Sequence, residues 1–111
     1  MTSIPEHCVE GARKLSKDEI AAMLGELEGE WGLKGDTLIA RRATLADFAA
    51  ALALVNEIGA LAEAENHHPD LAIKGYRNVE VQLSTHDVDG LSANDFALAR
   101  QIDALVARAS G

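Results

Sequence analysis

Residues 63–92 read EAENHHPDLAIKGYRNVEVQLSTHDVDGLS. This stretch predicts the end of a helix, two strands and the start of another helix. Pro69 ends the first helix, because the residue before a proline avoids the helical region of backbone space. Apolar and polar residues alternate over 79–84, which indicates a strand with one buried face. Residues 71–74 predict a shorter strand just before it.

The segment before this stretch, residues 45–66, is the longest periodic segment of the chain and predicts a helix capped by Thr44. Its apolar positions cover so much of the helical surface that we expect contact with a sheet and also with something else, such as a partner subunit. The predicted main stripe consists of Leu45, Phe48, Leu52, Val55, Gly59 and Ala62, widened by Leu54, Ile58 and Leu61.

The sequence predicts further elements before and after these two segments. Ser16 and Glu19 fit a capping box that opens a helix. Residues 31–43 predict a hairpin, with a type II′ turn at Gly35. Ser92 begins a last helix, with Asp95 at the capping-box position. The resulting order is helix, two strands, helix, two strands, helix. It favours an α+β fold in which a four-stranded antiparallel sheet carries the helices on one face.

The composition limits the class of protein. The chain has 111 residues and a net charge of −8. We expect a flexible lead-in over residues 1–14 and one domain over 15–111. The acidity argues against direct nucleic-acid binding, which needs clustered cations. No apolar run is long enough to span a membrane, and the single Cys8 cannot form an intrachain disulfide, so we expect a cytoplasmic protein.

Three of the four histidines lie within twenty residues, at His67, His68 and His86. Histidine titrates close to neutral pH, so a cluster of histidines suits acid–base chemistry. Glu63 lies four residues before His67 on the same helical face and could orient that imidazole. A strand that returns beside the helix end would bring His86 to the other two histidines.

The same residues can also be accounted for without a shared active site. A histidine at a helix C-terminus is favoured by the helix dipole. Asp95 is explained by capping alone, and Trp31 by packing of the hairpin. Zinc could bind His67, His68, His86 and Glu63, but adjacent histidines rarely reach one metal and the spacing of zinc motifs is missing.

A longer pattern surrounds the histidines. Glu63-x-x-Asn66-His67-His68-Pro69 is followed by Tyr76-x-x-Val79-x-Val81-x-Leu83-Ser84-Thr85-His86, and then by Gly90-Leu91-Ser92 and Asp95. This pattern resembles the signature of the pterin-4a-carbinolamine dehydratases. Trp31 before a hairpin, and Asp47-Phe48, are also similar to that family. The similarity extends over roughly residues 15–107.

The resemblance implies dehydration of 4a-hydroxytetrahydropterin to quinonoid dihydropterin, a hydro-lyase reaction that needs no metal and no organic cofactor. It also implies a homodimer or homotetramer. The implied catalytic residues are His67, His68, His86 and Glu63. We expect His67 and His86 to transfer protons and His68 to hold the substrate. The implied substrate-binding residues are those three histidines with Asn66, Ser84, Thr85, Asp87, Trp31 and Asp95, the last of which could also support His86.

Two alternatives to this enzyme remain. Proteins with this fold also serve as coactivators or assembly proteins without catalysis, and the acidity of the chain does not exclude contact with another protein. An accessory role in molybdopterin metabolism is the other alternative. The presence of all three histidines favours the enzyme, because a chain used only for binding has no need to keep them together.

Overall fold

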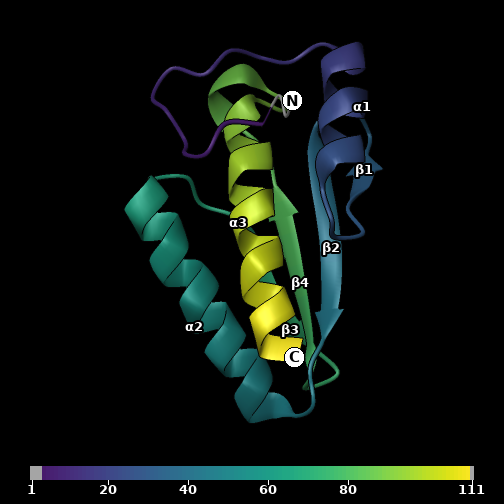
Figure 1. Ribbon diagram of the computed structural model, residues 1–111, viewed down its shortest axis with the longest axis vertical. Helices are drawn as coiled ribbons and strands as arrows, with labels where there is room; N and C mark the ends of the chain where they lie inside the picture. Colours follow the sequence, from purple (N-terminus) through teal and green to yellow (C-terminus); the bar gives the residue numbers. More distant parts are fainter. Residues whose placement is uncertain (1–3, 111) are drawn as a thin grey trace.

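The computed structural model describes residues 4–110. Within this range it has the predicted α+β order, and Figure 1 shows α2 and α3 lying across one face of the sheet. In chain order the elements are α1 (Lys17–Glu26), β1 (Gly32–Lys34), β2 (Leu38–Thr44), α2 (Phe48–Glu65), β3 (Asp70–Lys74), β4 (Asn78–Leu83), the 3₁₀ turn η1 (His86–Val88) and α3 (Ala93–Ser110).

The sheet is antiparallel, with the strand order β1-β2-β4-β3. β4 therefore lies inside the sheet, between β2 and β3. Asp70 at the start of β3 is opposite Gln82 near the end of β4. This register places the segment that joins α2 to β3 beside the segment that follows β4. The two halves of the histidine pattern meet at this end of the sheet.

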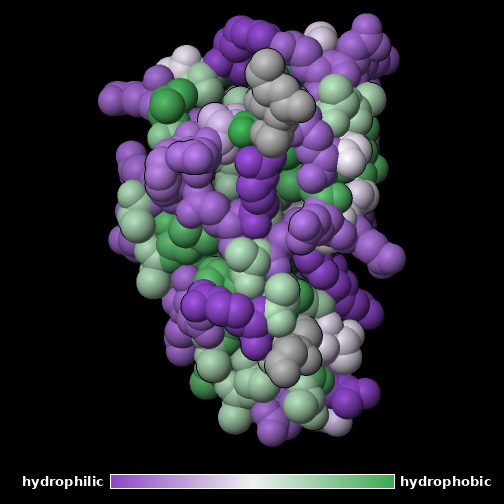
Figure 2. All heavy atoms as spheres, in the orientation of Figure 1, coloured by the Kyte–Doolittle hydropathy of each residue, from purple (hydrophilic) through white to green (hydrophobic). Residues whose placement is uncertain are grey.

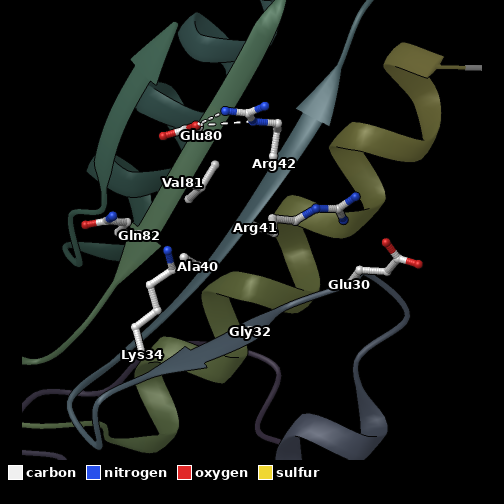
Figure 3. Close-up of a pocket in the computed structure, with 9 residues that line it drawn as sticks. All are labelled: Glu30, Gly32, Lys34, Ala40, Arg41, Arg42, Glu80, Val81 and Gln82. Atoms are coloured by element: carbon white, nitrogen blue, oxygen red, sulfur yellow. Dashed lines mark hydrogen bonds and ion pairs between the residues drawn. The ribbon is translucent and has the colours of Figure 1, made fainter. Parts of the chain in front are cut away.

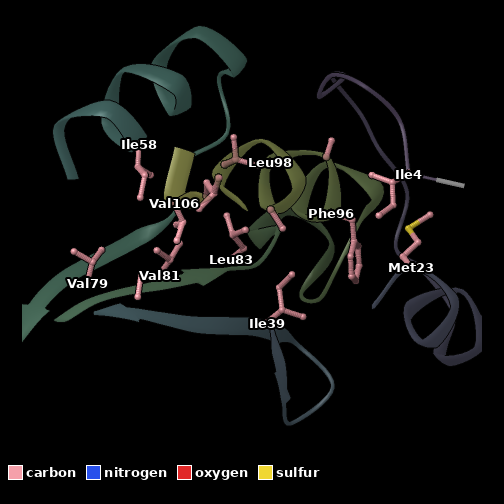
Figure 4. Packing of buried hydrophobic residues seen from close by; sticks show 14 of the residues in the cluster. Ile4, Met23, Ile39, Ile58, Val79, Val81, Leu83, Phe96, Leu98 and Val106 are labelled. Atoms are coloured by element: carbon pink, nitrogen blue, oxygen red, sulfur yellow. The ribbon is translucent and has the colours of Figure 1, made fainter. Parts of the chain in front are cut away.

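The core lies between this sheet and the helices (Figure 4). In β4 the odd-numbered residues Val79, Val81 and Leu83 are buried, as the alternation predicts. Ile39 of β2 and Phe96 of α3 are fully buried against the same cluster. Full burial of an apolar side chain of this size contributes about 1.5–3 kcal/mol, so these contacts dominate the stability of the fold.

α2 begins later than the sequence predicts. The Asp47 carboxylate, not Thr44, caps the helix by accepting a hydrogen bond from the Ala50 amide at 2.8 Å. Thr44 remains the last residue of β2, where its hydroxyl lies 2.7 Å from the Asn78 side chain. The strand therefore continues through the position that was expected to start the helix.

The buried face of α2 also differs from the predicted stripe. The helix buries Ala51, Leu54, Ile58 and Ala62. Phe48 and Leu52, which belong to the predicted stripe, keep 51% and 44% of their surface exposed. The prediction was therefore right for Leu54, Ile58 and Ala62 and wrong for Phe48 and Leu52. Nearly every side of this helix carries apolar residues, so periodicity alone could not choose among them.

The cap of α1 and the β1–β2 hairpin test two local predictions in the N-terminal half of the chain. The capping box of α1 is confirmed: the Glu19 amide donates to Ser16 Oγ at 3.2 Å, and the Ser16 amide donates to Glu19 Oε1 at 3.0 Å. The hairpin is confirmed, but its turn is longer than predicted. Lys34 pairs with Leu38, so residues 35–37 form the connection, and Gly35 adopts a φ of 55°.

Residues 4–13, which we call the N-terminal strap, have no regular secondary structure but lie against the domain. Ile4 is buried in the core. The Cys8 amide donates to Glu65 at 2.7 Å, and Val9 exchanges two hydrogen bonds with the Asn94 side chain, at 2.8 and 2.7 Å. The flexibility expected for residues 1–14 remains a prediction, while the described part of this segment is tied to α2 and α3. Over the described residues, no helix has the length and apolarity that a membrane span requires.

Candidate active site

A buried carboxylate holds the first histidine of the pattern. His67 Nε2 lies 2.7 Å from Asp95 Oδ1, and the exposed fractions of the two side chains are 12% and 0%. An ionised carboxylate can only accept, so Nε2 carries the proton in this contact. The lone pair of a neutral His67 then lies on Nδ1. Asp95 therefore fixes both the orientation and the tautomer of this imidazole.

The second oxygen of Asp95 ties the histidine to the loop after β4. Oδ2 accepts from the Thr85 hydroxyl at 2.8 Å and from the Ser92 amide at 3.0 Å. The Ser92 contact is the predicted capping interaction, and it places the carboxylate at the N-terminal end of α3. A buried carboxylate needs such partners, because its hydration has been lost. The Asp95 side chain thus contacts His67, whereas the resemblance implied that it could support His86.

The end of α2 explains why His67 turns inward. Asn66 adopts the left-handed conformation, with φ 53° and ψ 41°, a region that asparagine tolerates better than most residues. The His67 amide then bonds back to the Ala62 carbonyl at 3.2 Å. This pattern of six-to-one bonding is a Schellman-type helix end. It sends the chain toward α3 at the point where the imidazole must meet Asp95.

His68 occupies a different environment. Its Nε2 contacts Glu63, and both side chains are exposed, at 57% and 77%. Glu63 thus pairs with His68, whereas the sequence suggested that it orients His67. An exposed pair of this kind contributes little to the stability of the fold, because water competes for both groups.

The third histidine lies on the loop after β4. His86 is exposed and begins η1, and it lines a cavity of about 220 Å³ together with Ser84 and Thr85. Asp89 closes this turn with a φ of 51°. Thr85 connects the two halves of the site, since it precedes His86 and also donates to the carboxylate that holds His67.

A larger cleft of about 690 Å³ borders these residues. It includes three of the predicted substrate-binding residues, Asn66, Thr85 and Asp87. Its other lining residues come from the strap, from the end of α2, from η1 and from the start of α3: Cys8, Val9, Glu10, Gly11, Ala12, Arg13, Glu65, Val88 and Asn94. Sequence reasoning missed the strap, because 85 residues separate Val9 from Asn94 and no local pattern links them.

Cys8 lies in this cleft but is a poor nucleophile there. Burial, followed by the charge of Glu65, raises the pKa of its thiol to about 12. The thiol therefore stays protonated at neutral pH, and reactive chemistry needs the thiolate. Over residues 4–110, no three His, Cys, Asp or Glu side chains gather into a group that could hold a metal ion.

Trp31 does not join the histidines. It precedes β1 at one edge of the sheet, whereas His67 and His68 precede β3 at the opposite edge. Its indole Nε1 donates to Asp103 Oδ1 at 2.9 Å. Arg41 reaches the same oxygen at 2.5 Å. The indole is thus part of a polar cluster beneath α3 and lies away from the histidine segments.

Another cavity, of about 400 Å³, lies on strands β1, β2 and β4 (Figure 3). Charged side chains surround it, and the Arg42 guanidinium reaches Glu80 across the two strands at 2.5 Å. None of the predicted site residues lines this cavity. The cleft of about 690 Å³ is lined by Asn66, Thr85 and Asp87, and is therefore the better candidate for the functional site.

The chain is similar in sequence to known proteins. The family model for pterin 4 alpha carbinolamine dehydratase matches residues 13–105. A protein of Chloroflexus aggregans described as a candidate pterin-4-alpha-carbinolamine dehydratase is 43% identical over 93 residues, which are 84% of this chain and 97% of that protein. A protein of Halorhodospira halophila with the same description is 40% identical over 105 residues, covering 94% of this chain and 93% of its own length.

Solved structures agree on the fold. A transcriptional coactivator/pterin dehydratase from Brucella melitensis superposes with a TM-score of 0.77 and 30% identity, over 84% of this chain and 98% of that one. A pterin dehydratase-like protein identified as a RuBisCO assembly factor of the α-carboxysome has a TM-score of 0.58 over 70% of this chain and 88% of that one. At 22% identity, this second likeness concerns the fold alone.

Proposed function

The chain belongs to the pterin 4 alpha carbinolamine dehydratase family, and on this premise we propose that it converts 4a-hydroxytetrahydropterin to quinonoid dihydropterin and water. The observation that carries the proposal is the His67–Asp95 pair at 2.7 Å beside the loop that bears His86. Two histidines on neighbouring segments can serve the two proton transfers that such a dehydration requires.

The reaction sets the task of these groups. The bond between C4a and the hydroxyl oxygen breaks, and the oxygen leaves as water after receiving a proton. The adjacent ring nitrogen loses a proton, and its electron pair forms the new double bond to C4a. One acid and one base therefore suffice, and the proton balance of the enzyme is restored when the two groups exchange a proton with water.

We assign the base to His67, because Asp95 holds the proton on Nε2 and leaves Nδ1 free to accept one. Asp95 also stabilises the imidazolium that forms, because its charge lies directly against the ring. His86 is assigned as the acid that protonates the leaving hydroxyl. His68, paired with Glu63, is assigned to holding the substrate.

The remaining substrate contacts come from the cleft. Asn66 and Asp87 line it and can hydrogen-bond the edge of the pterin, and Ser84 lines the smaller cavity beside His86. Thr85 lines both cavities. Because its hydroxyl already donates to Asp95, we assign it to holding the carboxylate as much as to the substrate.

A stopped-flow assay of the decay of 4a-hydroxytetrahydropterin tests this function directly. The parent chain should accelerate the decay, and His67→Ala and His86→Ala should each lower the accelerated rate by about 100-fold or more. No acceleration by well-folded parent protein would overturn the enzyme. Full activity of the double variant His67→Ala/His86→Ala would instead overturn the assignment of the two roles.

A binding role on the same fold is the second candidate function. It is favoured by one finding, since the similar Brucella melitensis protein is described as a transcriptional coactivator/pterin dehydratase. A well-folded but inactive chain would support a coactivator, an assembly protein or an accessory of molybdopterin metabolism. The stopped-flow measurement therefore separates the two classes of function.

We also propose that the chain forms a homodimer or homotetramer through α2. Phe48 and Leu52 remain largely exposed on this helix, and Figure 2 shows apolar side chains reaching the surface along it. A groove of about 420 Å³ runs between α2 and α3, with Leu61 and Leu105 in its lining. Exposed apolar surface of this kind marks contact sites between proteins.

A further inference from the structure

We propose that the N-terminal strap forms one wall of the pterin cleft, and that Glu10 is a substrate-contacting residue that determines specificity. This inference rests on the proposed dehydratase function. It goes beyond the family match, because that match begins at residue 13 and leaves most of the strap outside it.

The cleft lies directly beside the groups assigned to the chemistry. Each of these groups has a chain neighbour in the cleft lining: Asn66 precedes His67, Thr85 precedes His86, and Asn94 precedes Asp95. Neither histidine lines the cleft itself, so we place the substrate across the border, reaching from the two histidines into the cleft. A volume of about 690 Å³ also falls within the range of small-molecule sites.

The strap is attached at two points next to the same site. Asn94, buried at the start of α3, both accepts from and donates to the backbone of Val9. Glu65 accepts from the Cys8 amide. Two residues adjacent to the assigned site thus hold the backbone on both sides of the bond between residues 8 and 9. The three residues that follow this attachment, 10–12, line the cleft.

The charges of the lining indicate what the wall binds. Glu65 is already engaged by the Cys8 amide and by His7, and Arg13 donates to Glu19 at 2.9 and 2.5 Å. Glu10 and Asp87 are exposed carboxylates that line the same cleft. Carboxylates accept hydrogen bonds, so the complementary ligand group is a donor. A pterin offers such donors at two places, the amino edge of its pyrimidine ring and the hydroxyls of a side chain on C6.

The test compares Glu10→Gln with the parent chain on two substrates, the 4a-hydroxy forms of 6-methyltetrahydropterin and of 6-(dihydroxypropyl)tetrahydropterin. Loss of a charge-assisted hydrogen bond should lower kcat/KM by about tenfold, mainly through KM. A loss on the dihydroxypropyl substrate alone assigns Glu10 to the side chain of the substrate. An equal loss on both substrates assigns it to the ring edge. The matched control is Glu6→Gln, the same change on a strap residue that does not line the cleft, and it should leave both values unchanged.

A binding measurement separates this inference from the proposed function. Titration of the parent chain with 7,8-dihydrobiopterin should shift the amide NMR signals of Gly11 and Ala12, even if the chain proves inactive as a dehydratase. Unchanged kinetics of Glu10→Gln on both substrates, or a bound pterin that leaves the signals of residues 9–12 unmoved, would overturn the strap wall while leaving the dehydratase standing. Inactive parent protein with shifts at Gly11 and Ala12 would retain the wall and overturn the enzyme.

Discussion

Asp95 Oδ1 and His67 Nε2 are 2.7 Å apart, and the carboxylate is fully buried. Replacing Asp95 by Asn removes the charge and permits the opposite tautomer of His67. We expect kcat to fall by about 10–100-fold while KM changes less than about threefold, because Asp95 is proposed to orient the base His67 and not to contact the substrate.

Steady-state kinetics and the ¹⁵N NMR shifts of the His67 ring check this prediction together. The exposed Asp18→Asn variant in α1 carries the same chemical change and should retain parental kinetics. A variant Asp95→Asn that keeps both its kcat and the tautomer of His67 would contradict the assigned role. Circular dichroism at the assay temperature separates this effect from lost capping of α3.

The exposed His68–Glu63 pair should be far less important. For Glu63→Gln we expect a fall in kcat/KM of about two- to fivefold, since water already screens the interaction. The same stopped-flow assay, run beside Asp95→Asn, ranks the two carboxylates. A larger loss for Glu63→Gln than for Asp95→Asn would reverse this ranking.

Gly29 should tolerate no side chain. A Cβ there would lie 2.2 Å from Arg41 Nη1 and 2.3 Å from Asp103 Oδ1, inside the ion pair beneath α3. We expect Gly29→Ala to lower the free energy of unfolding by about 2–4 kcal/mol, because it separates partly buried charges. Gly25→Ala is the control, since no atom lies within 4 Å of its added Cβ. Urea denaturation should show Gly25→Ala as neutral or stabilising by up to about 1 kcal/mol.

The strap should attach most firmly in mildly acidic solution. The Cys8 amide and then His7 lower the pKa of Glu65 below its usual 4.5, so this contribution is present above pH 4.5 and is lost as the pH falls through the lowered value. The hydrogen bond to Glu65 and its charge raise the pKa of His7 above 6.5, so that contribution is complete below pH 6.5 and is lost as the pH rises through the raised value.

Both contributions are therefore present between pH 4.5 and pH 6.5. An NMR titration of the His7 ring measures the second one. Glu65→Gln should return the midpoint toward the unperturbed value, whereas Glu6→Gln should move it only slightly. Equal midpoints in the parent and Glu65→Gln would contradict the ion pair.

The exposed side of α2 predicts the assembly state. A charge in the centre of an apolar contact is costly to bury, so Leu52→Glu should shift the protein toward monomer in size-exclusion chromatography with light scattering. Ala53→Glu is the control, because the next residue points about 100° away around the helix. A monomeric parent chain would leave Phe48 and Leu52 without the proposed partner.

The sequence predicted those parts of the molecule that depend on local patterns. The alternation of Val79, Val81 and Leu83 identified β4 and its buried face, and the Ser16 capping box was found from four residues. The presence of α2 was predicted, but its start was predicted too early and its buried face only in part, since an apolar residue occurs on almost every side of it. The cap at Thr44 failed because strand pairing with Asn78 outweighed its helix-capping tendency.

The candidate site could be predicted from the sequence only in part, for a related reason. The register of β3 and β4 brought the two histidine segments together as the sequence suggested. The partners of the histidines were not predictable, because spacing favoured Glu63 for His67 while the chain path at Asn66 delivers His67 to Asp95. Trp31 matched the family pattern by position, yet its indole is bound by Asp103 across 72 residues.

The pairing of Asp70 with Gln82 has a consequence for the order of folding. The two segments that carry His67 and His86 belong to a single hairpin, whose closure requires only a short loop and costs little chain entropy. The strap joins Asn94 across 85 residues, a contact that local structure cannot form early. We therefore expect refolding chains to assemble the histidines first and to gain the strap last.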